Sequence, residues 1–172
     1  MIKQTIWSFL LLAMMGLSAC KTEPYDAMVE SNEYTLTNWM ERYNDAWNFR
    51  FECDQSVTAI SQNIIDDGAV MCYLKDEANN AYIALPYSYG GNQTASSNGS
   101  YANITMGFVL QNGKIVFSYE GFDDLDVHTS SELNAANIKV KVVVISPDKM
   151  ASQPNVDLNN YEEVKSAFSI QE

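Results

Sequence analysis

Apolar and polar residues alternate along several short stretches of the chain, the pattern of β-strands with one buried face. Phe49, Phe51 and Cys53 alternate with polar or charged residues and predict one half-buried strand. Residues 69–74 form a continuous apolar run, which predicts a buried central strand. In residues 138–145, apolar residues first alternate with lysine, and the second half is apolar on both faces. We therefore expect this strand inside a sheet.

A β-hairpin is predicted where residues 101–108 and 114–119 flank the pair Asn112-Gly113. Asn-Gly readily adopts the two positive φ angles of a type I′ turn, which matches the twist of the flanking strands. Residues 120–137 are acidic and lack periodicity, so we expect them to form a longer connection.

Two short helices complete the local pattern. Residues 57–66 carry isoleucines at helical spacing between a capping Ser56 and Gly68, which stands where a C-terminal cap glycine belongs. Near the end of the chain, Asn159 is expected to cap a second helix, with Glu162 three residues on. Its apolar side, expected to pack on the β domain, comprises Leu158, Tyr161, Val164, Lys165 and Phe168.

With further short strands at 34–36 and 82–85, the chain has six to seven predicted strands separated by turn signals. This number favours a mainly β fold: one β-sandwich-like domain, or a small open barrel, with one short internal helix and a short C-terminal helix.

The N-terminal segment has the pattern of a bacterial lipoprotein signal. An apolar run from Ile6 to Gly16 follows the basic Lys3 and ends in Leu17-Ser18-Ala19-Cys20. It is shorter than the about 20 residues that a transmembrane helix needs. Cleavage before Cys20 would leave its thiol and amine to carry lipid. The alternative is a plain secretory signal with a chance cysteine.

The expected domain organisation follows from this signal. We predict a signal peptide at 1–19, a flexible acidic tether at 20–33, the β domain at 34–146 and a tail with the short helix at 147–172. The formal net charge is −12, from 10 basic and 22 acidic residues. This acidity argues against nucleic acid and against anionic lipid head groups as partners, because both attract clustered lysine and arginine.

If Cys20 carries lipid, Cys53 and Cys72 remain as an even pair in an oxidising compartment. They form either a disulfide or two buried free thiols, and their spacing allows both outcomes. A zinc site is not expected, because the chain has no Cys-x-x-Cys and its only histidine is His128.

Four segments of the chain carry recognisable motifs: residues 64–74 (IIDDGAVMCYL), 84–87 (ALPY), 142–145 (VVVI) and 160–165 (NYEEVK). They resemble the GxVxVYL, LPY and VVVI strands and the NYxxVK tail of a group of secreted lipoproteins from Bacteroidota. The tryptophan that usually precedes the LPY strand is replaced here by Tyr82 or Ile83. The resemblance implies an outer-membrane or cell-surface lipoprotein with a β domain, and it implies no catalytic residue.

Candidate catalytic and metal residues are few. His128 has no nucleophile motif around it, so we interpret it as a loop histidine. Carboxylate pairs are expected by chance in so acidic a chain. Asp123, Asp124 and Asp126 could offer oxygens to calcium, but they lack the spacing and terminal glutamate of an EF-hand.

Aromatic residues are the better candidates for ligand contact. Tyr87 and Tyr89 lie two apart, on one face of an extended segment before a glycine-rich loop, and are our first choice. Stacking against sugar rings is an alternative to core packing for a wider set, which comprises Tyr82, Tyr87, Tyr89, Tyr101, Trp39 and Trp47.

The sequence therefore predicts a lipid-anchored protein of the outer membrane, on its periplasmic or surface-exposed face. We expect a non-catalytic binding or structural module without a cofactor, whose partners are the membrane, through the lipid, and an unknown protein or glycan. A carbohydrate-binding accessory lipoprotein is the alternative, and a hydrolase with a carboxylate pair comes third.

Overall fold

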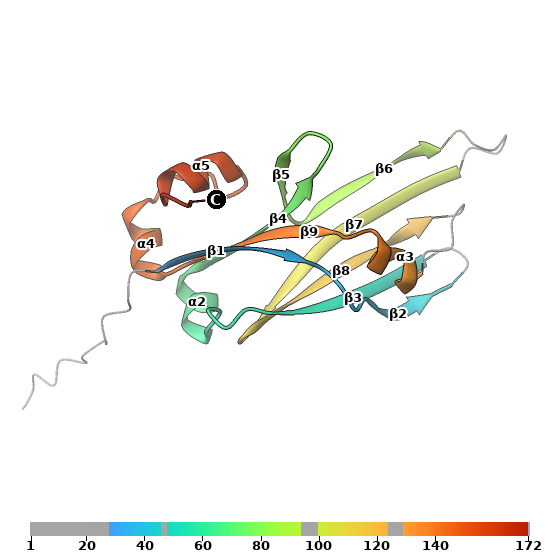
Figure 1. Ribbon diagram of the computed structural model, residues 1–172, viewed down its shortest axis with the longest axis horizontal. Coiled ribbons are helices and arrows are strands. Elements are labelled where there is room, and N and C mark those ends of the chain that lie inside the picture. The colour runs from blue at the N-terminus through green and yellow to red at the C-terminus, as the bar shows by residue number, and fades with distance from the viewer. Residues whose placement is uncertain (1–27, 46–47, 94–99, 124–128, 172) are drawn as a thin grey trace, which may run out of the picture.

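The computed structural model describes residues 28–45, 48–93, 100–123 and 129–171. Within these residues, nine strands form two antiparallel sheets that lie face to face, with four short helices at the ends and on one outer face (Figure 1). The predicted mainly β, sandwich-like fold is confirmed. The strands outnumber the predicted six to seven because several polar edge strands carry no apolar alternation.

The four-stranded sheet has the order β1-β9-β4-β5. β9 lies between β1 and β4, as the apolar run predicts. Its Val140, Val142 and Val144 belong to the core between the sheets, while Val143 and Ile145 face the opposite side. The strands are β1 (Val29–Thr35), β4 (Ala69–Asp76), β5 (Ala81–Ala84) and β9 (Lys139–Ile145).

The five-stranded sheet has the order β2-β3-β8-β7-β6. Its longest strands are β7 and β8, which form the predicted hairpin in the register Gln111↔Lys114. The strands are β2 (Met40–Asn44), β3 (Asn48–Ser56), β6 (Tyr87–Gln93), β7 (Ser100–Gln111) and β8 (Lys114–Asp123).

The hairpin turn differs from the predicted type I′. Only Gly113 has a positive φ angle, of 78°, whereas type I′ requires one at Asn112 as well. The Gly113 amide donates to the carbonyl of Ile60 at 2.7 Å, and its own carbonyl accepts from Val57 at 2.9 Å. The turn conformation is therefore set by contact with the loop after β3 and not by the hairpin alone.

The main core lies between the sheets, where Phe51, Phe117, Ile115 and Val140 are fully buried. The alternation at Phe49, Phe51 and Cys53 places all three side chains in this core, as predicted. Burial of this apolar surface supplies the main stabilisation of the fold.

A second core lies on the outer face of the four-stranded sheet, under the C-terminal helices α4 (Pro147–Ser152) and α5 (Tyr161–Ala167). Tyr161 and Val164 pack on Tyr73, Val143 and Ile145, as the predicted stripe requires. The helix cap is Asn160, one residue later than predicted, because its side chain accepts from the amides of Glu162 and Glu163.

The internal helices also differ from the prediction. α2 (Gln62–Asp67) begins after Ser61, whose hydroxyl accepts from the amide of Ile64, so Ser56 is not its cap. Gly68 ends this helix with extended backbone, and a Cβ there would lie 2.6 Å from the carbonyl oxygen of Ile145. Close packing on β9 therefore explains this glycine.

A further helix occupies the predicted connection 120–137, where β8 continues to Asp123 and α3 (Ser130–Ala135) follows. Thr129 and Glu132 form a reciprocal capping box at its start. Thr-x-x-Glu is a signature of helix starts, so the acidic stretch did contain a sequence signal for this helix.

The first strand begins earlier than predicted. β1 pairs with β9 from Val29↔Ile145 to Thr35↔Lys139, so residues 29–33 belong to the sheet and not to a tether. Its polar residues are held by backbone pairing, which the side-chain pattern does not reveal.

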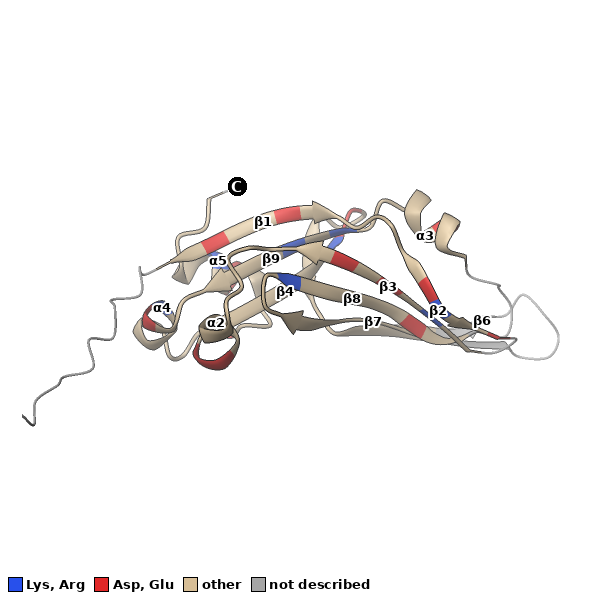
Figure 2. Cartoon of the chain, turned by 90° about the horizontal axis from the view of Figure 1, so that it is seen from below, with Lys and Arg blue, Asp and Glu red and all other residues tan. Residues whose placement is uncertain are grey.

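In the described part of the chain no helix is long and apolar enough to cross a membrane. Acidic residues are spread over both sheets and the short helices (Figure 2).

Candidate functional site

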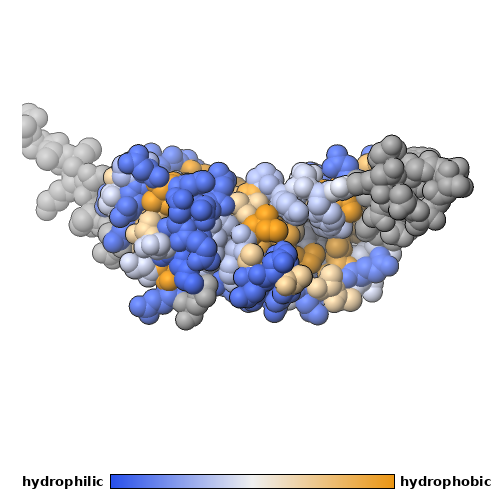
Figure 3. All heavy atoms as spheres, turned by 90° about the horizontal axis from the view of Figure 1, so that it is seen from above, coloured by the Kyte–Doolittle hydropathy of each residue, from blue (hydrophilic) through white to orange (hydrophobic). Residues whose placement is uncertain are grey.

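A groove of about 500 Å³ lies between the end of the four-stranded sheet and the inner face of β6, β7 and β8. Figure 3 shows apolar side chains gathered in a hollow near the middle of this side of the molecule, between hydrophilic neighbours. The apolar lining comprises Leu74, Ile83, Tyr87, Tyr89, Met106, Tyr119 and Ile138. The polar rim comprises Lys75, Asp76, Glu77, Asn137 and Lys139.

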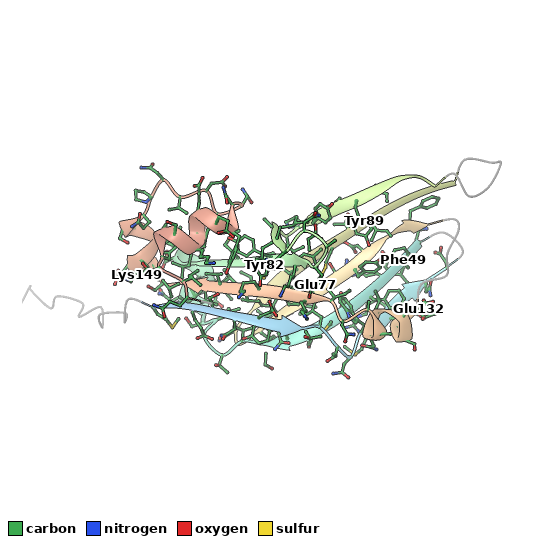
Figure 4. All side chains as sticks on the ribbon, turned by 45° about the horizontal axis from the view of Figure 1, so that its top comes forward. Phe49, Glu77, Tyr82, Tyr89, Glu132 and Lys149 are labelled. Atoms are coloured by element: carbon green, nitrogen blue, oxygen red, sulfur yellow. The ribbon has the colours of Figure 1, made fainter. Side chains whose placement is uncertain are left out.

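The groove exists because the two sheets differ in length at this end. β4 ends at Asp76 and β9 begins at Lys139, whereas β7 and β8 run on to Ser100 and Asp123. Among the described residues, no strand therefore faces this end of the longer sheet. Figure 4 shows Glu77 at the end of the shorter sheet and Tyr89 on β6 of the longer one.

Tyr87 and Tyr89 form the aromatic wall of the groove. Their ring centroids are 5.9 Å apart and the rings are stacked at 23°. Tyr87 packs partly against the core, whereas Tyr89 is 41% exposed. The prediction that these two residues share one face of an extended segment is confirmed, and that face turns towards the groove.

Tyr119 connects this wall to the core. Its hydroxyl lies 2.9 Å from that of Tyr89, and its ring stacks on Phe49 with the centroids 5.5 Å apart. The Trp39 ring meets the Tyr119 ring edge-on at 6.4 Å. Trp39 is buried, and its indole nitrogen has no hydrogen-bond partner in the part of the chain that the structure describes.

The charged side chains of the rim are paired. Lys139 Nζ lies 2.8 Å from Glu77 Oε1, and Lys75 Nζ lies 3.3 Å from Glu33 Oε2. The hydrogen bond from Lys139 lowers the pKa of Glu77 below its ordinary value. Asp76 accepts from the side chain and backbone of Asn79, which lowers its pKa as well.

Tyr82 does not belong to the groove. Its hydroxyl donates to Glu33 at 2.7 Å, a bond that is the main cause of the lowered pKa of Glu33. Its ring lies 4.5 Å from that of Tyr161, and Lys141 Nζ lies 5.3 Å from the ring centroid. Tyr82 is thus engaged on the outer face of its sheet, so the predicted aromatic set does not form one platform.

The remaining aromatic candidates are less informative. Tyr101 stands opposite Asn92 in the β6–β7 ladder, but the structure does not describe its side chain. Trp47 lies outside the described residues. Trp39 belongs to the core and not to an exposed face.

Cys53 and Cys72 are free thiols, so the disulfide alternative is not found. Cys53 lies on β3 and Cys72 on β4, in different sheets, and facing sheets pack about 10 Å apart. The Cys53 thiol donates to the carbonyl of Thr37 at 2.9 Å. Burial raises the pKa of both thiols, most strongly that of Cys72.

The metal and histidine candidates fall largely outside the described residues. Asp124, Asp126 and His128 are among the residues that are not described, and Asp123 is described in its backbone alone. Among the residues that the structure does describe, no cluster of three or more histidine, cysteine or acidic side chains could hold a metal ion. The lipidation candidate Cys20 also lies outside the described range.

Sequence reasoning missed Met106, Tyr119, Lys75 and Lys139 as lining residues of the groove. Met106 and Tyr119 are direct partners in the β7–β8 ladder, and the predicted hairpin could have placed them on one face. Their exposure to a groove depends on where the facing sheet stops. That boundary has no signal in the sequence of the hairpin itself.

The chain matches no protein-family model, no curated protein and no solved structure. The resemblance to secreted lipoproteins therefore stays a prediction.

Proposed function

We propose that this protein is a lipid-anchored, non-catalytic binding module of the bacterial outer membrane, and that its ligand occupies the groove between the end of the four-stranded sheet and β6, β7 and β8. The single observation that carries this proposal is the stacked Tyr87–Tyr89 wall over an apolar groove of about 500 Å³. Largely apolar pockets with a few polar groups at the rim are the usual form of small-ligand sites.

The charges of the rim favour a neutral ligand. Lys75 and Lys139 are each paired with a glutamate, and Asp76 binds its own turn, so an added charge would compete with existing partners. The formal net charge of −12 also disfavours an anion.

The same rim argues against hydrolysis. A general acid of a glycosidase needs a raised pKa, and the pKa values of Asp76 and Glu77, the carboxyl groups that line the groove, are lowered. Both side chains therefore remain charged acceptors, a state that suits ion pairing and turn capping.

A neutral glycan is the second candidate ligand, favoured by the Tyr87–Tyr89 stack. A sugar ring is uncharged, offers a flat C–H face to an aromatic ring and carries hydroxyls. The hydroxyls of Tyr89 and Tyr119, which lie 2.9 Å from each other, stand at this wall. This arrangement would make the protein an accessory that captures envelope or extracellular polysaccharide.

Methyl NMR of methionine-labelled protein tests the groove directly. Met106 lines the groove, whereas Met40 lies on β2 and is 45% exposed, so one spectrum holds a reporter and an internal control. Titration with neutral oligosaccharides of several linkage types, and with neutral lipid extract, should shift the Met106 signal and leave Met40 unchanged.

Two variants make this titration decisive. Tyr89→Ala should raise the ligand concentration that half-saturates the Met106 shift about tenfold, because an aromatic contact contributes roughly 1.4 kcal/mol. Val109→Ala, at an exposed position on β7 outside the groove lining, should bind like the unchanged protein. Equal shifts at Met106 and Met40, or equal affinity of the two variants, would contradict the proposed site.

A further inference from the structure

The backbone edge of β6 is a second surface of the molecule, next to the groove that the side chains of Tyr87 and Tyr89 line. β6 is the last strand of its sheet in the described part of the chain, so one side of its backbone carries N–H and C=O groups without a partner strand. Its seven residues, Tyr87–Gln93, include no charged residue and no proline. Unprotected edges of this kind pair readily with another strand.

The other three edges carry the features that prevent such pairing. β1 carries Glu30 and Glu33. β2 is five residues long, contains Glu41 and Arg42, and has a register shift. β5 is only four residues long. β6 is therefore the one edge of the two sheets, as described, that combines length with neutrality.

We propose that β6 pairs antiparallel with β6 of a second copy of this chain. A twofold axis through Gly90 is the symmetric register that pairs all seven residues, because the strand extends three residues to either side. The two five-stranded sheets then join into one sheet across the dimer. Closed twofold pairing of identical patches is the commonest form of oligomer.

The register centred on Gly90 also fits the side chains. Tyr89 of each copy then stands opposite Gly91 of the other, which gives two equivalent Tyr–Gly pairs. An aromatic side chain beside a cross-strand glycine covers the backbone that glycine leaves bare. Tyr89 lines the groove and is 41% exposed in the single chain, so its ring has surface for a neighbouring strand as well as for the groove.

Among the possible contacts between two copies, the distribution of charge favours the β6 edge. Two molecules of formal net charge −12 repel each other, and acidic residues are spread over both sheets (Figure 2). β6 brings seven uncharged residues together. Because the backbone of β6 forms the contact, the pairing does not depend on a ligand in the groove.

Cysteine cross-linking of the full chain in intact cells tests the register. In the proposed dimer the two Gly90 Cα atoms lie about 4.5–5.5 Å apart, within disulfide reach. Gly90 belongs to the β6–β7 ladder, opposite Asn103, and so has the extended backbone that other residues also adopt. Gly90→Cys should give a dimer band after oxidation with copper phenanthroline, and reduction should abolish it.

Ser88→Cys is the matched control on the same strand. Its two copies would lie roughly 13 Å apart along the paired strands, beyond disulfide reach. The native Cys53 and Cys72 are buried and leave the background low. A dimer band for Gly90→Cys alone supports the proposal, whereas equal bands for both variants, or no band for Gly90→Cys, overturn it.

A measurement without substitutions keeps the test independent of the folding of either variant. Sedimentation of the unmodified full chain in detergent should give the mass of two chains. A mass of one chain at every concentration examined overturns the proposal.

Discussion

At the scale of single residues, the two cysteines show how alternation can be correct and still leave pairing open. The alternation placed Cys53 on the buried face of its strand, whereas Cys72 lay in a continuous apolar run, and both are buried in the main core. The sequence could not tell which sheet each strand joins, because that depends on long-range pairing. Cys53 pairs across to Phe117 and Cys72 to Val142, so the two thiols belong to opposite layers.

Thiol labelling follows from this arrangement. In the folded chain Cys53 and Cys72 should react slowly with iodoacetamide, because burial raises the pKa of both thiols and excludes the reagent. In denaturant without reductant, both should become labelled, and intact mass spectrometry counts the added groups. A denatured, unreduced chain in which both cysteines stay unlabelled would establish the disulfide instead.

At the scale of elements, strands with apolar alternation could be predicted and polar strands could not. The sequence predicted β3, β4, β5, β7, β8 and β9. Of β1, with the sequence VESNEYT, only the end near residues 34–36 was predicted, because its polar part is held by the ladder to β9. The residues that line the groove likewise fall into a predictable and an unpredictable set. Tyr87 and Tyr89 were identified from their spacing, but Lys139 and Ile138 reach the rim only because β9 begins there.

The helix α5 is expected to be an integral part of the domain and not a detachable tail. Tyr161 is 3% exposed, and its ring contacts Tyr73 and Tyr82 at centroid distances of 5.1 and 4.5 Å. Tyr161→Ala should lower the free energy of unfolding by about 3 kcal/mol, since it removes a buried aromatic ring and leaves a cavity. Urea unfolding followed by circular dichroism measures this loss.

Glu162→Ala is the control for that substitution, because Glu162 is the exposed neighbour in the same helix. Its effect should stay within about 0.5 kcal/mol, as for ordinary surface positions. Similar losses for both variants would mean that the ring of Tyr161 contributes no more than its exposed neighbour.

At the scale of the whole molecule, the start of the described chain and the groove are separated along the long axis. β1 begins at the end where α4 lies, whereas β6, with Tyr89, runs away from that end (Figures 1 and 4). A lipid at Cys20 would lie on the chain before Val29, so Tyr89 in the groove would lie away from the anchored end (Figure 4). This arrangement suits a module that meets its ligand beyond the membrane surface.

The anchor itself is the prediction on which that orientation depends. Cys20→Ala should move the protein from the membrane pellet to the soluble envelope fraction, because a single substitution removes the thiol that carries the lipid. Fractionation with immunoblotting measures the change. Ser18→Ala keeps a small residue before the cleavage site and should leave the protein in the pellet. If the Cys20→Ala variant stayed in the membrane pellet after removal of its signal peptide, lipid anchoring through Cys20 would be contradicted.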